Sequence, residues 1–180
     1  MRYWYKPISI FLSINLIIAQ VSGGKSQEAS KLVHVGYVGE SVENISENYQ
    51  NLVHQKMLSL VNQNFYEFYS PEDLSKSHLK HLDKILLNKE DSLSNDLSNL
   101  AKAANLDYIF VTVLNNISED PKRVMLKGEV LRYQANNNEL YRYEMLSYAE
   151  DINLHIQAIK KEMIDTIPHS VHTIGRKRTY

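Results

Sequence analysis

The pattern of apolar and polar side chains changes abruptly at residue 108. Before it, Leu93, Leu97 and Leu100 recur at helical spacing, which predicts an amphipathic helix with a narrow apolar side. Residues 108–114 are then almost all aromatic or β-branched, without polar alternation, which is typical of a strand covered on both faces. Asn105 stands between the two, where a left-handed residue ends a helix. We therefore expect a central strand whose neighbours come from the rest of the chain.

The flanking sequence predicts those neighbours. We expect early strands over residues 31–39 and 65–69, and helices that end before residues 62 and 88. Two alternating strands follow over 123–133 and 139–148, joined across 136–138. A last helix covers 151–167. Helices between the early strands favour parallel pairing, and the late hairpin is antiparallel. The prediction is an α/β (α+β) fold, a single mixed sheet of about five strands with helices packed on it, in the order β-α-β-α-α-β-β-β-α.

Capping residues predict where two of the helices begin, and a glycine predicts where the first strand ends. Asn44 and Glu47 fit a capping box, in which both side chains satisfy free backbone N–H groups. Ser70 precedes Pro71 and two acidic residues, an order that favours the first turn of a helix. Gly39 predicts a turn at the exit of the first strand.

Composition narrows the class of protein. The chain has 180 residues, of which 43% are hydrophobic and 23% charged, values typical of one globular domain. The net charge of −1 argues against a broad surface for nucleic acid. The chain contains no Cys, which excludes disulfides, thiol catalysis and thiolate metal sites.

The N-terminus has the pattern of a secretory signal peptide. Arg2 and Lys6 precede an apolar run over residues 8–19, which is shorter than the roughly 20 residues of a membrane-spanning helix. Cleavage after Ala19 and cleavage after Gly23 both fit. We expect residues 1–23 to be the signal peptide, 24–30 a linker, 31–168 the α/β domain and 169–180 a basic, disordered tail.

The same segment permits a second interpretation as a phosphate loop. Residues 19–26 fit the loose pattern with Ala19 at the first glycine position, so that Lys25 would reach the outer phosphates of a nucleotide and Ser26 would hold Mg²⁺. Polar residues interrupt the preceding apolar run, however, and the following segment soon becomes β-branched. No later strand ends in the Asp that would organise Mg²⁺. We favour the signal peptide.

Residues 100–110, Leu-Ala-Lys-Ala-Ala-Asn-Leu-Asp-Tyr-Ile-Phe, resemble the amino-terminal domain of the Tol-system protein TolB. There too a helix ends at a small residue before Asp-Tyr and an apolar strand, and a charged hairpin and a closing helix follow. The module also resembles the periplasmic part of the curli-secretion channel and lipoprotein activators of penicillin-binding proteins. Residues 36–39 and Thr112 depart from the family, which usually has Pro-Phe and Gly there. The resemblance implies an adaptor that docks onto other envelope proteins, with no cofactor and no catalytic residue.

Two pairs of side chains could carry chemistry. His78 and His81 are three residues apart on a predicted helix and could face one metal ion, but no carboxylate completes the set, so we expect no metal site. Glu129 and Glu144 lie on the two hairpin strands and could act as an acid and a base. We expect them instead to be solvated charges facing cations of the same hairpin, and we expect no catalytic residues.

Tyrosine is unusually abundant, with 12 Tyr against 4 Phe. Tyr133, Tyr141, Tyr143 and Tyr148 fall on or beside the hairpin, where they would suit a protein-contact surface. The alternative is that the last helix covers them, and alternation alone does not tell which face of a strand is covered.

These patterns lead to one expected function and two alternatives. We expect an exported, periplasmic, non-enzymatic adaptor or scaffold that binds other cell-envelope proteins and has no membrane span after signal cleavage. One alternative is a subunit of an outer-membrane secretion or flagellar assembly that multimerises. The other is a nucleotide-binding enzyme that uses Lys25 and Ser26.

Overall fold

The computed structural model describes residues 32–87, 92–120 and 123–168. The segments predicted as signal peptide and linker, with Lys25 and Ser26, and the predicted tail lie outside the described residues. The elements are β1 (His34–Glu43), α2 (Glu47–Val61), β2 (Glu67–Tyr69), α3 (Pro71–Leu87), α4 (Leu93–Ala104), β3 (Tyr108–Asn116), β4 (Met125–Gln134), β5 (Glu139–Tyr148) and α5 (Ile152–Ile159). A 3₁₀ turn (Ala149–Asp151) precedes α5, and a π-helical turn (Lys160–Ile164) follows it.

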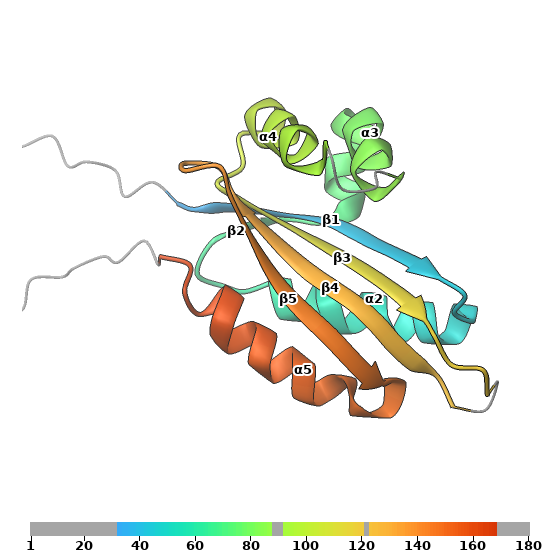
Figure 1. The fold of residues 1–180 in the computed structure, drawn as a ribbon. Coiled ribbons are helices and arrows are strands. Elements are labelled where there is room, and N and C mark those ends of the chain that lie inside the picture. The colour runs from blue at the N-terminus through green and yellow to red at the C-terminus, as the bar shows by residue number, and fades with distance from the viewer. Residues whose placement is uncertain (1–31, 88–91, 121–122, 169–180) are drawn as a thin grey trace, which may run out of the picture. The chain divides into compact units, whose positions relative to one another are not determined.

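The five strands form one mixed sheet in the order β2-β1-β3-β4-β5 (Figure 1). Strand β1 pairs in parallel with β2 and β3, whereas β4 and β5 continue the sheet in antiparallel pairs. The predicted fold class, the order of the elements and the central position of the strand that starts at Tyr108 are confirmed.

Helices lie on both faces of the sheet and bury two separate cores. Phe110 and Leu114 of β3 belong to the core beneath α2 and α5, and the alternate residues Ile109 and Val111 belong to the core beneath α3 and α4. Burying one such side chain contributes about 1.5–3 kcal/mol, so β3 alone stabilises both layers substantially. The absence of polar alternation in this strand follows from its two apolar surroundings.

Strand β1 contains a bulge between Tyr37 and Gly39, where its register with β3 shifts. Gly39 has a φ of 117°, a value that glycine adopts far more readily than other residues. The predicted exit turn at Gly39 is therefore wrong, because the glycine absorbs an extra residue and the strand continues to Glu43. In a regular strand Tyr37 and Glu40 would point to opposite faces; the bulge brings them to the same face, where their side chains are hydrogen-bonded.

Three helix boundaries test the predicted capping signals. Asn105 has the left-handed conformation expected of it, with a φ of 53°. The N–H of Asp73 donates a hydrogen bond to Ser70 Oγ over 3.2 Å, which confirms the start of α3. The capping box predicted at Asn44 is wrong: Asn44 is left-handed, with a φ of 57°, its side chain bonds to β3, and Ser46 is the N-cap of α2.

Among the described residues, no helix combines the length and the apolar character needed to cross a bilayer.

Candidate protein-binding face

Helices α3 and α4 cover only part of the sheet face on which they lie. Ile109, Val111 and Val113 follow one another on this face of β3, and their exposed fractions are 0%, 1% and 39%. Alternate residues of a strand lie only about 7 Å apart, so the cover ends abruptly between Val111 and Val113. Figure 1 shows α3 and α4 gathered over one end of the sheet, with no described helix in front of the other end of β3, β4 and β5.

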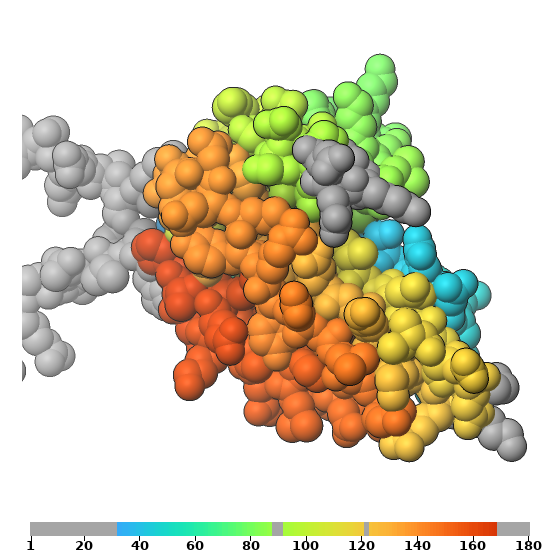
Figure 2. Space-filling view, in the orientation of Figure 1, coloured from blue at the N-terminus to red at the C-terminus, as the bar shows by residue number. Residues whose placement is uncertain are grey.

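The same boundary runs across the next two strands. Leu131 and Tyr133 of β4 are buried in the core beneath α3 and α4, whereas Lys127 on the same face is exposed. On β5 the exposed fraction of Leu146 is 63%. We call the uncovered part the open face; Figure 2 views the molecule from this side. Its residues are Val113, Lys127, Glu129, Arg142, Glu144 and Leu146.

A hollow of about 550 Å³ lies where the end of α3 meets the open face. Its apolar lining comes from Leu87 and Leu93 on the helical side and from Val111 and Val113 on the sheet. Leu87 is 80% exposed, although it belongs to the last turn of an amphipathic helix. The charged rim consists of Glu43, Lys127 and Glu129. An apolar floor with a charged rim is the arrangement that protein interfaces use.

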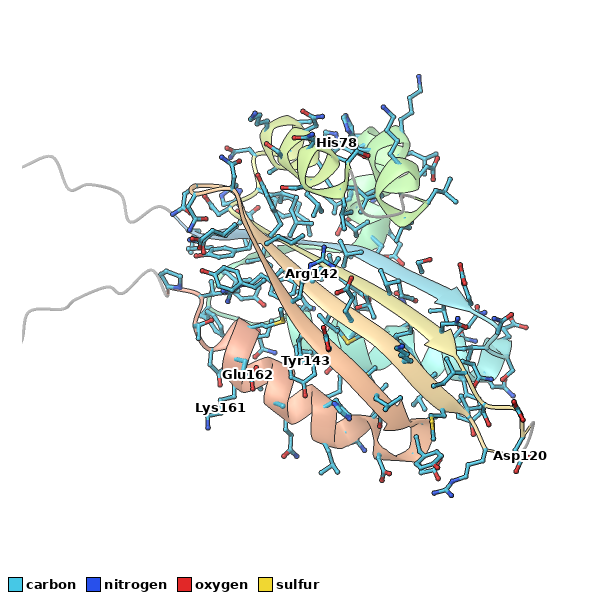
Figure 3. The ribbon with its side chains drawn as sticks, in the orientation of Figure 1. His78, Asp120, Arg142, Tyr143, Lys161 and Glu162 are labelled. Atoms are coloured by element: carbon cyan, nitrogen blue, oxygen red, sulfur yellow. The ribbon has the colours of Figure 1, made fainter. Side chains whose placement is uncertain are left out.

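The charges of the open face are of both signs and only partly paired. Arg142 Nη1 lies 2.8 Å and 3.0 Å from the two carboxylate oxygens of Glu129. Arg142, labelled in Figure 3, lies opposite Leu131 of β4, at the boundary between the covered part of the sheet and the open face. Glu144 stands directly opposite Glu129 in the β4–β5 ladder, and neither it nor Lys127 forms an ion pair with another described residue. A surface with alternating charges suits a protein partner better than a polyanion.

A buried polar cluster on the opposite face joins β1, β3 and α2. The hydroxyl of Tyr37 lies 3.2 Å from Thr112 Oγ1 and 3.1 Å from a carboxylate oxygen of Glu40. The other oxygen of Glu40 lies 2.8 Å from Nδ1 of His54. Burial, followed by the nearby charge of Glu40, raises the pKa of Tyr37 well above its ordinary value, so the hydroxyl keeps its proton. Because Tyr37 and Thr112 are fully buried, this cluster holds the sheet to α2.

No sequence pattern singled out Tyr37, Glu40 and His54. The one readable signal is Gly39 inside a strand, which is typical of a bulge. A bulge at that position would have predicted that Tyr37 and Glu40 share a face.

The four tyrosines predicted as a contact surface divide between the two faces of the hairpin. Tyr133 is 1% exposed beneath α4, and its hydroxyl donates a hydrogen bond to Asn138. Tyr143 lies on the other face, where its hydroxyl is 3.1 Å from Nδ1 of His155 on α5. Tyr141 is exposed and Tyr148 half-buried. A role in protein contact stays a prediction, and exposure favours Tyr141 and Tyr148 for it.

The guanidinium of Arg132 contacts both the Tyr141 ring of β5 and the end of the last helix. It lies over the Tyr141 ring at 4.3 Å and donates hydrogen bonds of 2.6 Å to the Met163 carbonyl oxygen and to Thr166 Oγ1. It thereby places a positive charge at the carboxyl end of the last helix, where the helix dipole favours one.

The other two pairs of candidate residues are also placed. The rings of His78 and His81 are 6.4 Å apart at a kink of α3, and the described residues contain no group of three or more His, Asp or Glu that could hold a metal ion. Glu129 faces Arg142 on the same hairpin, as expected of a solvated charge.

Comparison with known proteins gives similarity of backbone only. No protein-family model matches the chain, and no curated protein matches its sequence. Among solved structures, the lipoprotein GNA1162 from Neisseria meningitidis has a TM-score of 0.44 at 5% identity, over 76% of this chain and 99% of that chain. The LpoB C-terminal domain from Salmonella enterica has a TM-score of 0.37 at 12% identity, over 74% of this chain and 93% of that chain. The LpoB C-terminal domain from Escherichia coli has a TM-score of 0.38 at 13% identity, over 73% and 93%. The predicted resemblance to TolB stays a prediction.

Proposed function

We propose that this chain is an exported, non-enzymatic adaptor of the cell envelope, and that the open face beside the end of α3 binds another protein. The observation that carries the proposal is the exposure of Val113 and Leu87 at the two sides of one hollow. A folded domain normally covers a sheet face of this kind with a helix of its own, so an uncovered apolar strip with a charged rim favours a partner.

The lining of the hollow indicates the chemistry of that partner. The apolar floor accommodates one or two aliphatic or aromatic side chains, as the centre of an interface does. The rim carries Glu43 and Glu129 against Lys127, and Glu129 is already paired with Arg142. We therefore expect a folded envelope protein that inserts an apolar side chain next to Lys127 and offers a basic side chain to Glu43.

Site-specific photo-crosslinking in cells tests this surface. A photoreactive amino acid is placed at Val113 in the full chain, and the matched control carries it at Leu154, which is 68% exposed on α5. We expect one discrete envelope protein to be captured at position 113 and not at 154. Equal capture at both positions, or none at 113, contradicts the proposal.

The affinity of the captured partner for a variant with a charged side chain in the hollow gives an independent test. Val113→Asp should weaken its binding at least tenfold, because the carboxylate loses water when the hollow closes. Leu154→Asp should leave the affinity unchanged. If both variants bind as the wild type does, the hollow is not the contact.

Export is tested on the same chain by N-terminal sequencing of the protein recovered from the periplasm. The apolar run behind Arg2 and Lys6 supports cleavage after Ala19 or Gly23. Either cut removes the strand that a phosphate loop with Lys25 and Ser26 would need. An uncleaved cytoplasmic protein that binds ATP would overturn the proposal in favour of the nucleotide-binding alternative.

A further inference from the structure

Strand β5 forms one edge of the sheet and pairs with β4 alone among the described strands. It is ten residues long and contains no proline and no lysine, two residues with which proteins commonly block an edge. Tyr141, Arg142, Glu144 and Leu146 are exposed along it. An edge of this length presents unpaired backbone groups that can accept a further strand.

The side chains of β5 on the open face are complementary to themselves. They read Leu140, Arg142, Glu144 and Leu146 in order. When two copies of the strand run antiparallel about a twofold axis at Tyr143, Arg142 of each copy lies opposite Glu144 of the other, and Leu140 lies opposite Leu146. Moving the axis to Arg142 or to Glu144 would instead place like charges opposite each other, so the charges select the first register.

Within the described part of one chain, Glu144 lacks the opposite charge that a second copy would supply. Glu129 and Glu144 stand opposite each other across β4 and β5, and the guanidinium of Arg142 pairs with Glu129. Glu144 has no ion-pair partner among the described residues, and like charges in this position destabilise a sheet. A second copy would place a guanidinium opposite Glu144, and it would also give the 63% exposed Leu146 an apolar neighbour.

We propose that two copies of this chain associate through β5, antiparallel and centred on Tyr143, so that their two sheets become one continuous sheet. Residues 139–147 of each copy would lie opposite one another along about 30 Å of strand. The dimer uses the β5 edge of the open face, whereas the adaptor function is tested at Val113 in the hollow beside α3, which no residue of β5 lines, so the two proposals can fail independently.

Sedimentation equilibrium of the purified, exported full chain measures the dimer directly, and Glu144→Arg is the decisive variant. Within one chain this substitution places a cation opposite Glu129, so the fold is not harmed. Between two chains it sets Arg142 against an arginine twice. We expect the dissociation constant of the dimer to rise about 30-fold, which corresponds to about 2 kcal/mol at 1.4 kcal/mol per factor of ten.

The charge swap Arg142→Glu with Glu144→Arg completes the test. It restores opposite charges across the axis and keeps one cation and one anion beside Glu129, so it should return the dissociation constant to within about threefold of the wild type. Glu119→Arg, an equal charge change in an exposed loop, should have no effect. Each of three results overturns the proposal. The first is a wild type that is still monomeric at roughly 100 μM. The others are a dissociation constant that Glu144→Arg leaves unchanged, and one that the charge swap does not restore.

Discussion

Substitution of Gly128 in β4 should strongly destabilise the fold, because the neighbouring backbone of β3 leaves no room for a side chain. A Cβ at this position would overlap the carbonyl oxygen of Val113 and would lie 2.9 Å from Cα of Leu114. These are backbone atoms, so the strain cannot be relieved by a side-chain rotation, and β3 must separate from β4. Loss of two ladder hydrogen bonds at about 1 kcal/mol each, with loosened packing of the adjacent core, gives about 3–4 kcal/mol for Gly128→Ala.

The matched control is Gly36→Ala in β1. There the Cβ would lie 2.7 Å from a methyl carbon of Leu106, the far end of a flexible side chain that can turn away. We expect a loss of about 1 kcal/mol or less. Urea unfolding of the full chain, followed by circular dichroism, gives both free energies of unfolding. The reasoning is refuted if the free energy of unfolding of Gly128→Ala lies within about 0.5 kcal/mol of the wild-type value. It is also refuted if that free energy lies within about 0.5 kcal/mol of the value for Gly36→Ala.

Three further predictions concern single polar groups. Burial raises the pKa of Tyr37 above its ordinary 10.0, so the wild type loses stability as the pH rises past 10 and the folded state resists loss of this proton. Tyr37→Phe removes the titrating group. The free energy of unfolding, measured from about pH 9 upward, should therefore fall less steeply in this variant than in the wild type. The hydrogen bond from Lys76 lowers the pKa of Asp73 below 3.8, so its contribution is present above that pH and lost below it; Asp73→Asn should make acid unfolding less steep. Arg132→Met should cost about 2 kcal/mol and speed amide exchange near Met163, since the end of the last helix loses its donor.

The sequence predicted those parts of the fold that depend on local pattern. The uninterrupted apolar run that starts at Tyr108 indicated a strand covered on both faces, and β3 occupies the middle of the sheet. Asn105 and Ser70 end and begin helices because their conformation and side-chain oxygen act within one turn of the chain. Asn44 looked equally suited to a cap, but a bond to Asn115, which is far away in sequence, holds it in a left-handed conformation outside the helix.

The candidate site was less predictable because it depends on where the helices stop covering the sheet. Tyr133 shares its face with Lys127 and Glu129, so alternation alone could not tell that Tyr133 is covered and Lys127 is not. It is buried because α4 lies over that end of β4 and not over the other. The number of tyrosines on the hairpin therefore could not separate the covered residues from the exposed ones.

The extent of the open face can nevertheless be read from a single strand. The residues of β4 on this face are Met125, Lys127, Glu129, Leu131 and Tyr133, so the apolar pair at one end is followed by two charges. A helix laid over Lys127 and Glu129 would have to remove both charges from water, and an ion pair with Arg142 would offset only part of that cost. The charges therefore fix where α3 and α4 can end. They also leave Val113, which has the same type of side chain as Val111 and lies on the same face of β3, available to a partner that brings its own polar groups to the rim.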